Sequence, residues 1–385
     1  MTTPRVAFLI NSLGTGGAER AVLAIASELM SRGSDLRLLC LESSPANAAA
    51  PIPVRQLSNA PSGAHGIAKL VALPRLGLRL SSYVSRERVD VVVSHLFRAN
   101  FVNVLSRILG GARHRAIVVN HTRLSRVRSE GTQGRVNGLL CRWLYPKADV
   151  VANVSIGATR ETAEMLGLSS GRCTTLSDPI DTTAAARAAA HAPPCEAIVA
   201  VGRLVELKRF NDLLLAFSRV APDYPQLGLR LVGDGPLRPA LEQQAAESGF
   251  AERITFFGAL ADPFPVVAGC RAFVSTSGTE GFGMAIAEAL ALGVPVIAAD
   301  CAYGPREILF PSSDPTQLLG PEDDLARAPF GILYPVGSTR KLEEALRLLL
   351  ADGDLRGDLS RGGPARAAEF SLERSAAAYA DLLSV

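Results

Sequence analysis

Residues 5–33 read RVAFLINSLGTGGAERAVLAIASELMSRG. A short apolar run comes first, followed by a turn with glycines at 14, 16 and 17 and by apolar residues at helical spacing from Val22 to Met30. This order predicts a strand, a loop and a helix. Because repeated strand and helix pairs build parallel sheets, the stretch indicates an α/β fold.

The remainder of the first half repeats this unit. Further strand-like runs, with helical stretches between most of them, are LRLLCL (36–41), VDVVVS (89–94), AIVVN (116–120) and DVVANVS (149–155). Such alternation predicts a parallel sheet that is covered by helices on both faces.

The pattern restarts after residue 195. The segment TTAAARAAAHAPPC (182–195) has few large apolar residues and ends near two prolines, so we expect a linker or an exposed loop. Strand-like runs then return, and they are AIVAVG (197–202), LGLRLVG (227–233), ITFFG (254–258), AFVSTS (272–277) and VPVIAA (294–299). Between them we expect helices, for example over 209–221 and 236–248. The sequence therefore predicts two Rossmann-like units in series, for which 385 residues are sufficient.

The two units define the expected domains. We place an N-terminal domain at 1–175 and a C-terminal domain at 176–365, and we expect segment 366–385 to form a closing helix that packs back on the first domain. Ligands of open parallel sheets bind beyond the carboxyl ends of the strands, so two such units facing each other predict a cleft between them.

The composition is that of a globular protein, with 48% hydrophobic and 20% charged residues. No apolar run approaches the roughly 18 residues needed to span a bilayer, and the run from Val6 to Ile10 is too short for a secretory signal, so we expect a cytoplasmic protein. Six cysteines without a CxxC pair argue against a disulfide framework and a structural zinc site. We interpret them as reduced and mostly buried.

Charge is distributed unevenly along the chain. Residues 1–175 hold 22 Lys and Arg against 10 Asp and Glu, a net charge of +12, whereas the rest of the chain carries −9. The excess concentrates in a basic segment, 107–147, in which Glu130 is the one acid. Its basic residues are Arg107, Arg113, Arg115, Arg123, Arg126, Arg128, Arg135, Arg142 and Lys147.

Such a field attracts phosphates, anionic lipid or nucleic acid, with an ordinary solvated face as the alternative. Nucleic acid is disfavoured because the basic segment has one Trp and one Tyr and so lacks an aromatic platform.

Glycines also mark the first candidate binding loop, GTGGAER. Their spacing is not the GxGxxG of a dinucleotide site, so a nicotinamide cofactor is poorly supported. Around Gly16 and Gly17 the loop offers free backbone amides at a helix N-terminus, which suits an anionic group. A turn that needs glycine only for tight geometry is an equally open interpretation.

Two cations follow a strand in the second half. VGRLVELKRF places Arg203 just after the strand and Lys208 at the start of the next helix. Two cations at one strand end can neutralise a diphosphate leaving group, whereas isolated surface cations would only be solvated. The nearby turn LVGDGP is by default an ordinary glycine turn.

A pair of glutamates stands in STSGTEGFGMAIAEAL. The chain leaves a strand at Ser277 and enters a helix near Gly283, so the amides of residues 283 and 284 form an anion site. Glu280 can accept hydrogen bonds from sugar hydroxyls, and Glu288 can hold a ribose diol. The alternative is that Glu280 complements the helix dipole and Glu288 is a surface acid.

These motifs carry a family resemblance. GGAER, VGRLVELKRF, VGDGP, EGFGMAIAE and CAYGPREIL (301–309) resemble the retaining glycosyltransferases of family 4, over residues 5 to about 380. The resemblance implies the GT-B fold, an α/β architecture in which two Rossmann-like domains face each other across a deep cleft. It also implies that the second domain binds a nucleotide-sugar donor and the first an acceptor, with no cofactor and no metal. CAYGPREIL resembles a branch that often uses UDP-linked hexoses or N-acetylhexosamines.

The resemblance also assigns roles to single residues. It implies His121 and Glu280 as catalytic residues. His95, which also follows a strand, and Arg123 are candidates for an acceptor cleft, with a structural role as the alternative for a lone histidine at a strand end. The implied donor-binding residues are Gly16, Gly17, Arg203, Lys208, Gly281, Phe282, Gly283, Met284 and Glu288. An imidazole at the position of His121 can accept a hydrogen bond from a hydroxyl. One departure is LSDPID, which has Asp178 where the family commonly has Asn.

The leading hypothesis is therefore a retaining glycosyltransferase. It would move a hexose or N-acetylhexosamine from a UDP-sugar to a glycan or lipid-linked acceptor in cell-surface polysaccharide or glycolipid synthesis. We expect it in the cytoplasm, peripheral to the inner face of the membrane through its basic segment, with no nucleic-acid partner. The alternatives are a sugar-nucleotide epimerase of the same fold and an inactive donor-binding partner subunit.

Overall fold

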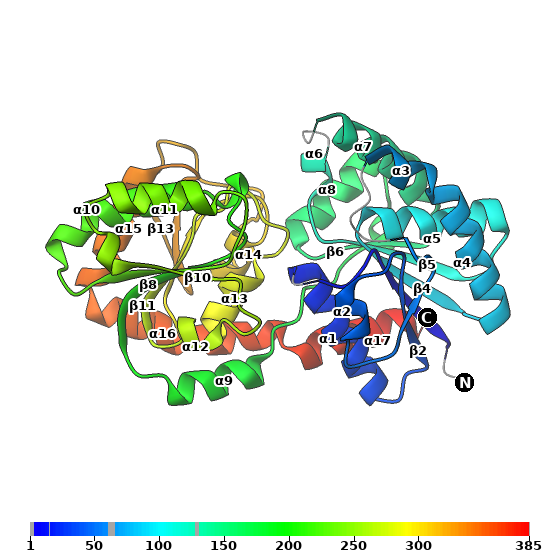
Figure 1. Cartoon of the computed structure of the whole chain (residues 1–385), viewed down its shortest axis with the longest axis horizontal. Coiled ribbons are helices and arrows are strands. Elements are labelled where there is room, and N and C mark those ends of the chain that lie inside the picture. The colour runs from blue at the N-terminus through cyan, green and yellow to red at the C-terminus, as the bar shows by residue number, and fades with distance from the viewer. Residues whose placement is uncertain (1–3, 15, 61–65, 128–130, 385) are drawn as a thin grey trace. The chain divides into compact units, whose positions relative to one another are not determined.

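The computed structural model describes residues 4–14, 16–60, 66–127 and 131–384 and divides into two compact units (Figure 1). Unit 1 comprises Met1–Pro179 and Leu372–Val385, and unit 2 comprises Ile180–Ser371. The chain thus passes twice between the units. The first and the last segments of unit 2 are hydrogen-bonded to each other, since the Ile180 N–H donates to the Phe370 carbonyl at 2.8 Å. The division falls at 179/180 and 371/372, a few residues after the boundaries placed from the sequence.

Unit 1 is built on a sheet whose described strands are all parallel, in the order β3-β2-β1-β4-β5-β6-β7. The strands are β1 (Val6–Ile10), β2 (Leu36–Cys40), β3 (Val54–Gln56), β4 (Val91–His95), β5 (Arg115–Asn120), β6 (Val150–Asn153) and β7 (Cys173–Thr175). The strand order reverses between β1 and β4, which is the position where open α/β sheets form a ligand crevice.

Unit 1 also contains helices, most of which lie between its strands along the chain. They are α1 (Gly17–Ser31), α2 (Pro45–Ala48), α3 (Gly66–Val71), α4 (Leu73–Glu87), α5 (Phe97–Gly110), α6 (Leu124–Val127), α7 (Gly131–Leu144), α8 (Ile156–Leu166) and the C-terminal α17 (Leu372–Leu383). Helix α17 packs beside α1 in unit 1 (Figure 1), and its Tyr379 ring lies 5.8 Å from the Phe8 ring of β1. The last helix therefore completes the core of the first unit.

Unit 2 repeats the plan with the strand order β10-β9-β8-β11-β12-β14-β13 in its described residues. The pairings are parallel except that β13 runs antiparallel to β14. The strands are β8 (Cys195–Val201), β9 (Gly228–Val232), β10 (Ile254–Gly258), β11 (Cys270–Ser275), β12 (Val296–Ala299), β13 (Ala326–Ala328) and β14 (Gly331–Tyr334).

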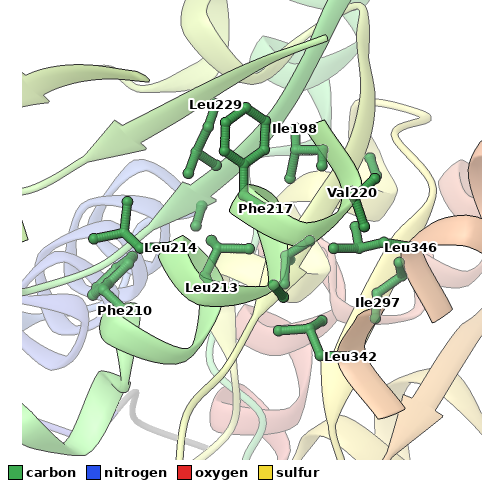
Figure 2. Packing of buried hydrophobic residues seen from close by; sticks show 14 of the residues in the cluster. Ile198, Phe210, Leu213, Leu214, Phe217, Val220, Leu229, Ile297, Leu342 and Leu346 are labelled. Atoms are coloured by element: carbon green, nitrogen blue, oxygen red, sulfur yellow. The ribbon is translucent and has the colours of Figure 1, made fainter. Parts of the chain in front are cut away.

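The helices of unit 2 pack against the sheet or, in the case of α9 and α16, against other helices. They are α9 (Thr182–His191), α10 (Phe210–Val220), α11 (Arg238–Glu247), α12 (Phe264–Val267), α13 (Met284–Ala291), α14 (Pro305–Leu309), α15 (Thr339–Ala351) and α16 (Gly353–Ala367). Figure 2 shows the core between α10, α15 and the sheet, where Phe217 of α10 lies beside Leu229 and Ile198. Burying such side chains contributes roughly 1.5 to 3 kcal/mol each.

The expected linker at 182–195 is wrong, because residues 182–191 form helix α9 and Cys195 begins β8. Alanine has the highest helix propensity, so an alanine-rich segment needs few large apolar residues to be helical. The Asp181 carboxylate also caps this helix by accepting from the Ala184 N–H at 2.8 Å. The cysteines are all free, and Cys40, Cys141, Cys270 and Cys301 are buried.

Candidate active site

The candidate donor-binding residues of unit 2 follow β8 and β11, which are neighbours in the sheet. The turn after β9 packs against the loop after β8 so closely that only glycine fits. A Cβ atom on Gly233, which has φ +136°, would lie 1.9 Å from the Gly202 carbonyl oxygen. On Gly235 a Cβ would lie 2.4 Å from the Leu204 carbonyl oxygen. The VGDGP turn is therefore a support for the loop that carries Arg203 and Lys208.

Lys208 and Glu280 contact each other. Lys208 ends a short 3-10 helix (Glu206–Lys208), and its Nζ lies 2.5 Å from Glu280 Oε1. Both side chains are mostly buried, with 23% and 15% of their surface exposed. The loops on which they stand are also joined, since the Thr276 hydroxyl donates to the Lys208 carbonyl at 2.6 Å. Arg203, by contrast, is exposed.

The loop after β11 is fixed by the loop after β12. The Thr279 hydroxyl donates to the Ala302 carbonyl at 2.5 Å, and Gly304, with φ +108°, would place a Cβ 1.8 Å from the Phe282 carbonyl oxygen. Cys301 lies behind the ion pair, and burial, followed by the charge of Glu280, raises the pKa of its thiol. These contacts hold Glu280 and the start of α13 in one arrangement.

A buried ion pair underlies this second loop. Arg306 of α14 donates from Nε to both carboxylate oxygens of Asp300 at 3.1 Å, and the Leu319 N–H donates to Asp300 Oδ2 at 2.8 Å. Removing one member would leave a buried charge unpaired, so the pair is a structural requirement of the loop. The pair was not evident from the sequence, although Asp300 directly precedes the CAYGPREIL motif and Arg306 lies within it.

Helix α13 begins where the glycine-flanked turn ends. Gly283 is its N-cap with φ +102°, Met284 is its first residue, and the amides there carry the partial positive charge of a helix N-terminus. Glu288 lies inside α13 and is 7% exposed, which contradicts the alternative of a surface acid. Gly281 is partly buried, and the Phe282 ring packs edge-on against Phe370 at 5.0 Å.

In unit 1 the two candidate histidines meet at neighbouring strand ends. β4 pairs with β5 so that His95 is opposite Val119, which brings His121, two residues further, to the same face. His95 Nδ1 lies 3.1 Å from His121 Nε2. His121 Nδ1 in turn lies 3.1 Å from Asp178 Oδ1, within ion-pair distance but without the angles of a hydrogen bond.

Both rings are enclosed. His95 is 1% exposed, and burial, followed by the charge of His121, places its pKa well below the usual range for histidine. In the sequence Asp178 stands out only as a departure from a family pattern, and its position after a strand is the signal that groups it with His121. His95 is therefore an interior residue of unit 1.

The remaining candidates of unit 1 follow β1 and β5. Gly16 is the N-cap of α1 and Gly17 its first residue, and Glu19 folds over them so that a Cβ on Gly16 would lie 2.3 Å from its carboxylate. Arg123 is partly buried, and its Nε has no hydrogen-bond partner among the described residues.

Some residues of the basic segment bind other parts of unit 1, and others are exposed. Arg107 pairs with Asp149 at 2.5 Å, and Arg115 donates to the Leu382 carbonyl at 2.6 Å. Arg135 and Arg142 are exposed on α7. Of the other predicted members, Arg128 and Glu130 lie outside the described residues.

The described part of the chain has neither a membrane-spanning helix nor a cluster of metal ligands. No helix there has the length and apolar character to cross a membrane. In the same residues, no group of three or more His, Cys, Asp and Glu side chains is arranged to hold a metal ion.

The sequence is similar to families and proteins of known function. Residues 15–184 match the model of Glycosyltransferase Family 4, and residues 184–366 match that of Glycosyl transferases group 1. The chain is 26% identical, over 95% of each sequence, to the N-acetylgalactosamine-N,N'-diacetylbacillosaminyl-diphospho-undecaprenol 4-alpha-N-acetylgalactosaminyltransferase of Campylobacter jejuni. It is also 32% identical over 48% of each sequence to a lipopolysaccharide core biosynthesis glycosyltransferase of Rhizobium meliloti.

A solved structure shows the same fold. The Anabaena protein HepE in complex with UDP superposes with a TM-score of 0.77 and 21% identity, covering 99% of each chain. The two family models together cover residues 15–366, and the two units in series with mostly parallel sheets are those predicted. The chain is thus an enzyme of the GT-B fold and belongs to the family 4 glycosyltransferases.

Proposed function

We propose that this enzyme is a retaining glycosyltransferase that moves a hexose or N-acetylhexosamine from a UDP-sugar to a glycan or lipid-linked acceptor. The acceptor would belong to lipopolysaccharide or another cell-surface polysaccharide or glycolipid. The observation that carries the proposal is the cluster of Lys208, Glu280 and the α13 N-terminus at the strand ends of unit 2. The names of the relatives, which include a diphospho-undecaprenol transferase and a UDP complex, support the chemical classes.

The donor would use this cluster as follows. Lys208 and Arg203 would contact the diphosphate, and the amides of Gly283 and Met284 would add donors from the helix end. As the glycosyl bond breaks, negative charge grows on the leaving diphosphate, and these groups stabilise it. Glu288 would accept from the ribose hydroxyls, and Glu280 from the transferred sugar. The diphosphate would then share Lys208 with Glu280.

No metal has a role in this proposal. Metal-dependent transfer uses a cation to neutralise the diphosphate, a task that falls here to Lys208, Arg203 and backbone amides. The one DxD-like sequence, DGD at 352–354, is engaged elsewhere, since Asp352 caps α16 by accepting from the Leu355 N–H at 2.9 Å. Transfer should therefore persist in EDTA.

Contact with an anionic membrane surface is a further part of the proposal. On α7, Leu139 and Trp143 are 70% and 54% exposed, and the exposed Arg135 and Arg142 lie four residues before and three after Leu139. Apolar side chains among cations on one helical face suit the interface of a bilayer with acidic lipids. Such contact would bring unit 1 to a lipid-linked acceptor at the inner face of the cytoplasmic membrane.

A donor panel without acceptor tests the function. Slow hydrolysis would be measured for UDP-hexoses, UDP-N-acetylhexosamines and GDP-mannose, in EDTA, with NMR of the first-formed sugar anomer. We expect release from one UDP-sugar with the anomeric configuration kept, and no release by Glu280→Gln. Release from GDP-mannose alone, or an inverted anomer, would contradict the proposal. Conversion of the donor without release would favour the epimerase, and binding without turnover the inactive subunit.

A further inference from the structure

Three buried polar side chains form a line at the strand ends of unit 1. Asp178 follows β7, His121 follows β5, and His95 ends β4. Asp178 Oδ1 to His121 Nδ1 and His121 Nε2 to His95 Nδ1 are both 3.1 Å. The exposed fractions of the His121 and Asp178 side chains are 7% and 9%. Both ring nitrogens of His121 therefore have neighbours inside unit 1.

The neighbours determine where the proton of a neutral His121 resides. A bare Nδ1 would place the lone pair of the ring 3.1 Å from a carboxylate oxygen, which is repulsive, whereas an N–H there places a partial positive charge near the carboxylate. In a buried site this preference is stronger than in water. The proton therefore belongs on Nδ1, and Nε2 carries a lone pair.

His95 fits the same assignment. Because burial keeps its ring neutral, it has one N–H, and Nδ1 is the atom that faces the lone pair of His121. Its Nε2 has no hydrogen-bond partner among the described residues, and its ring lies 5.5 Å from the Phe8 ring and 6.2 Å from the Tyr379 ring. A proton on that atom would be a buried donor without an acceptor, which is costly.

We propose that Asp178 is a positioning residue that holds His121 as its Nδ1–H tautomer, so that Nε2 remains available as an acceptor. The proposal rests on the proposed function, in which His121 accepts a hydrogen bond from a hydroxyl of a substrate. In the free enzyme His95 Nδ1–H donates to the lone pair of Nε2, so a substrate hydroxyl reaches Nε2 only by taking the place of that hydrogen bond. A wrong tautomer would present an N–H to the same place, and the hydroxyl would lose its acceptor.

The tautomer can be observed without any substrate. Two-bond 1H–15N spectra of the full chain labelled with 15N-histidine report which ring nitrogen is protonated, at pH 8, above the usual histidine pKa of about 6.5. Signals are assigned by single His→Gln variants, and His114 and His191 serve as internal references for folding. We expect the Nδ1–H form for His121 in the wild type. The Nε2–H form, or a doubly protonated ring, would overturn the proposal even if no variant folds.

Variants then connect the tautomer to turnover. Asp178→Ala should shift His121 toward Nε2–H and lower kcat at least about tenfold, with the KM for the donor within about twofold. Asp178→Asn keeps an acceptor oxygen, so it should show the wild-type tautomer of His121 and the wild-type kcat. Asp181→Ala, which removes a nearby acid that only caps α9, should change neither.

The outcomes separate this inference from the proposed function. An Asp178→Ala spectrum identical to the wild type would overturn the positioning role, as would an altered tautomer with unchanged kcat. If no transfer is found with any donor and acceptor while the spectra behave as expected, the proposed function fails and the tautomer assignment stands.

Discussion

Lys208 Nζ and Glu280 Oε1 lie 2.5 Å apart, although the sequence places the two residues 72 positions from each other and assigns them to different parts of a donor. In the ligand-free protein each is therefore the counter-ion of the other. A diphosphate that approaches Lys208 brings a second negative charge to this cation. Binding and the position of Glu280 are consequently coupled, because Lys208 contacts both anions.

Replacing Lys208 should affect transfer far more than replacing Arg203. Lys208→Met removes a fixed cation and leaves Glu280 without its partner, so we expect at least about a hundredfold loss of kcat/KM. Arg203→Met removes an exposed cation and should cost less. Arg340→Met, which removes an exposed cation on α15, is the control. Equal rates for Lys208→Met and the control would refute the role of Lys208.

The effects of replacing Lys208 and Glu280 on the free energy of unfolding should also depend on each other. In thermal unfolding, the double variant Lys208→Met with Glu280→Gln should be more stable than the sum of the single effects predicts, by about 0.5 to 3 kcal/mol. Strict additivity would mean that the ion pair contributes nothing in solution.

Glu280 and Glu288 should differ in how they bind the nucleotide alone. Glu288→Gln should weaken UDP by about 1.5 to 3 kcal/mol, because a buried charged hydrogen-bonding group is changed. Glu280→Gln should bind UDP nearly as the wild type does while the chemical step slows. Calorimetry with UDP separates the two effects. Normal UDP binding by Glu288→Gln would remove this residue from the nucleotide site.

The sequence predicted the architecture because its strands are continuous apolar runs. β1 and β4 are buried at every residue and were recognised. The three-residue edge strand β3, with two exposed residues, carries no such signal, and the same holds for β13. Helix α9 was missed for a different reason, since its alanines favour a helix without giving an apolar stripe.

The sequence predicted where along the chain the candidate site residues lie, but it did not predict which of their side chains contact each other. Polar residues after parallel strands could be grouped because the carboxyl ends of the strands share one edge. The contacts of Lys208 with Glu280 and of His121 with Asp178 depend on loop geometry and side-chain direction, which periodicity does not encode. For this reason the contact of Asp178 with His121 and the Asp300–Arg306 pair emerged only from the structure.

Gly304→Ala should disturb the donor loop without touching a candidate donor-binding side chain. A Cβ at φ +108° would lie 1.8 Å from the Phe282 carbonyl, so the two loops must separate. We expect loss of more than about 2 kcal/mol of stability and weaker UDP binding. The matched control is Gly353→Ala, at the first position of α16, where the nearest atom is the flexible end of Arg356 at 3.6 Å. Normal UDP affinity in Gly304→Ala would contradict the close packing.

Membrane contact through α7 should depend on acidic lipid and on salt. Vesicles with acidic lipid should bind the protein at 0.1 M salt and release it near 1 M, because the Debye length falls from about 10 Å to about 3 Å. Arg135→Glu with Arg142→Glu should abolish binding, whereas Arg361→Glu, an exposed residue of unit 2, should not. Equal binding to neutral vesicles would rule out the electrostatic part of the proposal.

Protonation of His114 should lower the free energy of unfolding of unit 1 as the pH falls into the mildly acidic range. Its Nε2–H donates to Asn103 Oδ1 at 2.8 Å, and burial, followed by the charge of Arg107, lowers its pKa to about 4. The unfolded chain takes up this proton near pH 6.5, so stability is complete above that value and falls as the pH decreases toward 4, by about 2 kcal/mol at pH 5. His114→Gln should remove this part of the decrease, and the exposed His191→Gln should not. Urea unfolding at pH 7.5 and 5, followed by the fluorescence of Trp143 in the same unit, measures the difference. An unchanged decrease in His114→Gln would show that the native ring is protonated as easily as the unfolded one.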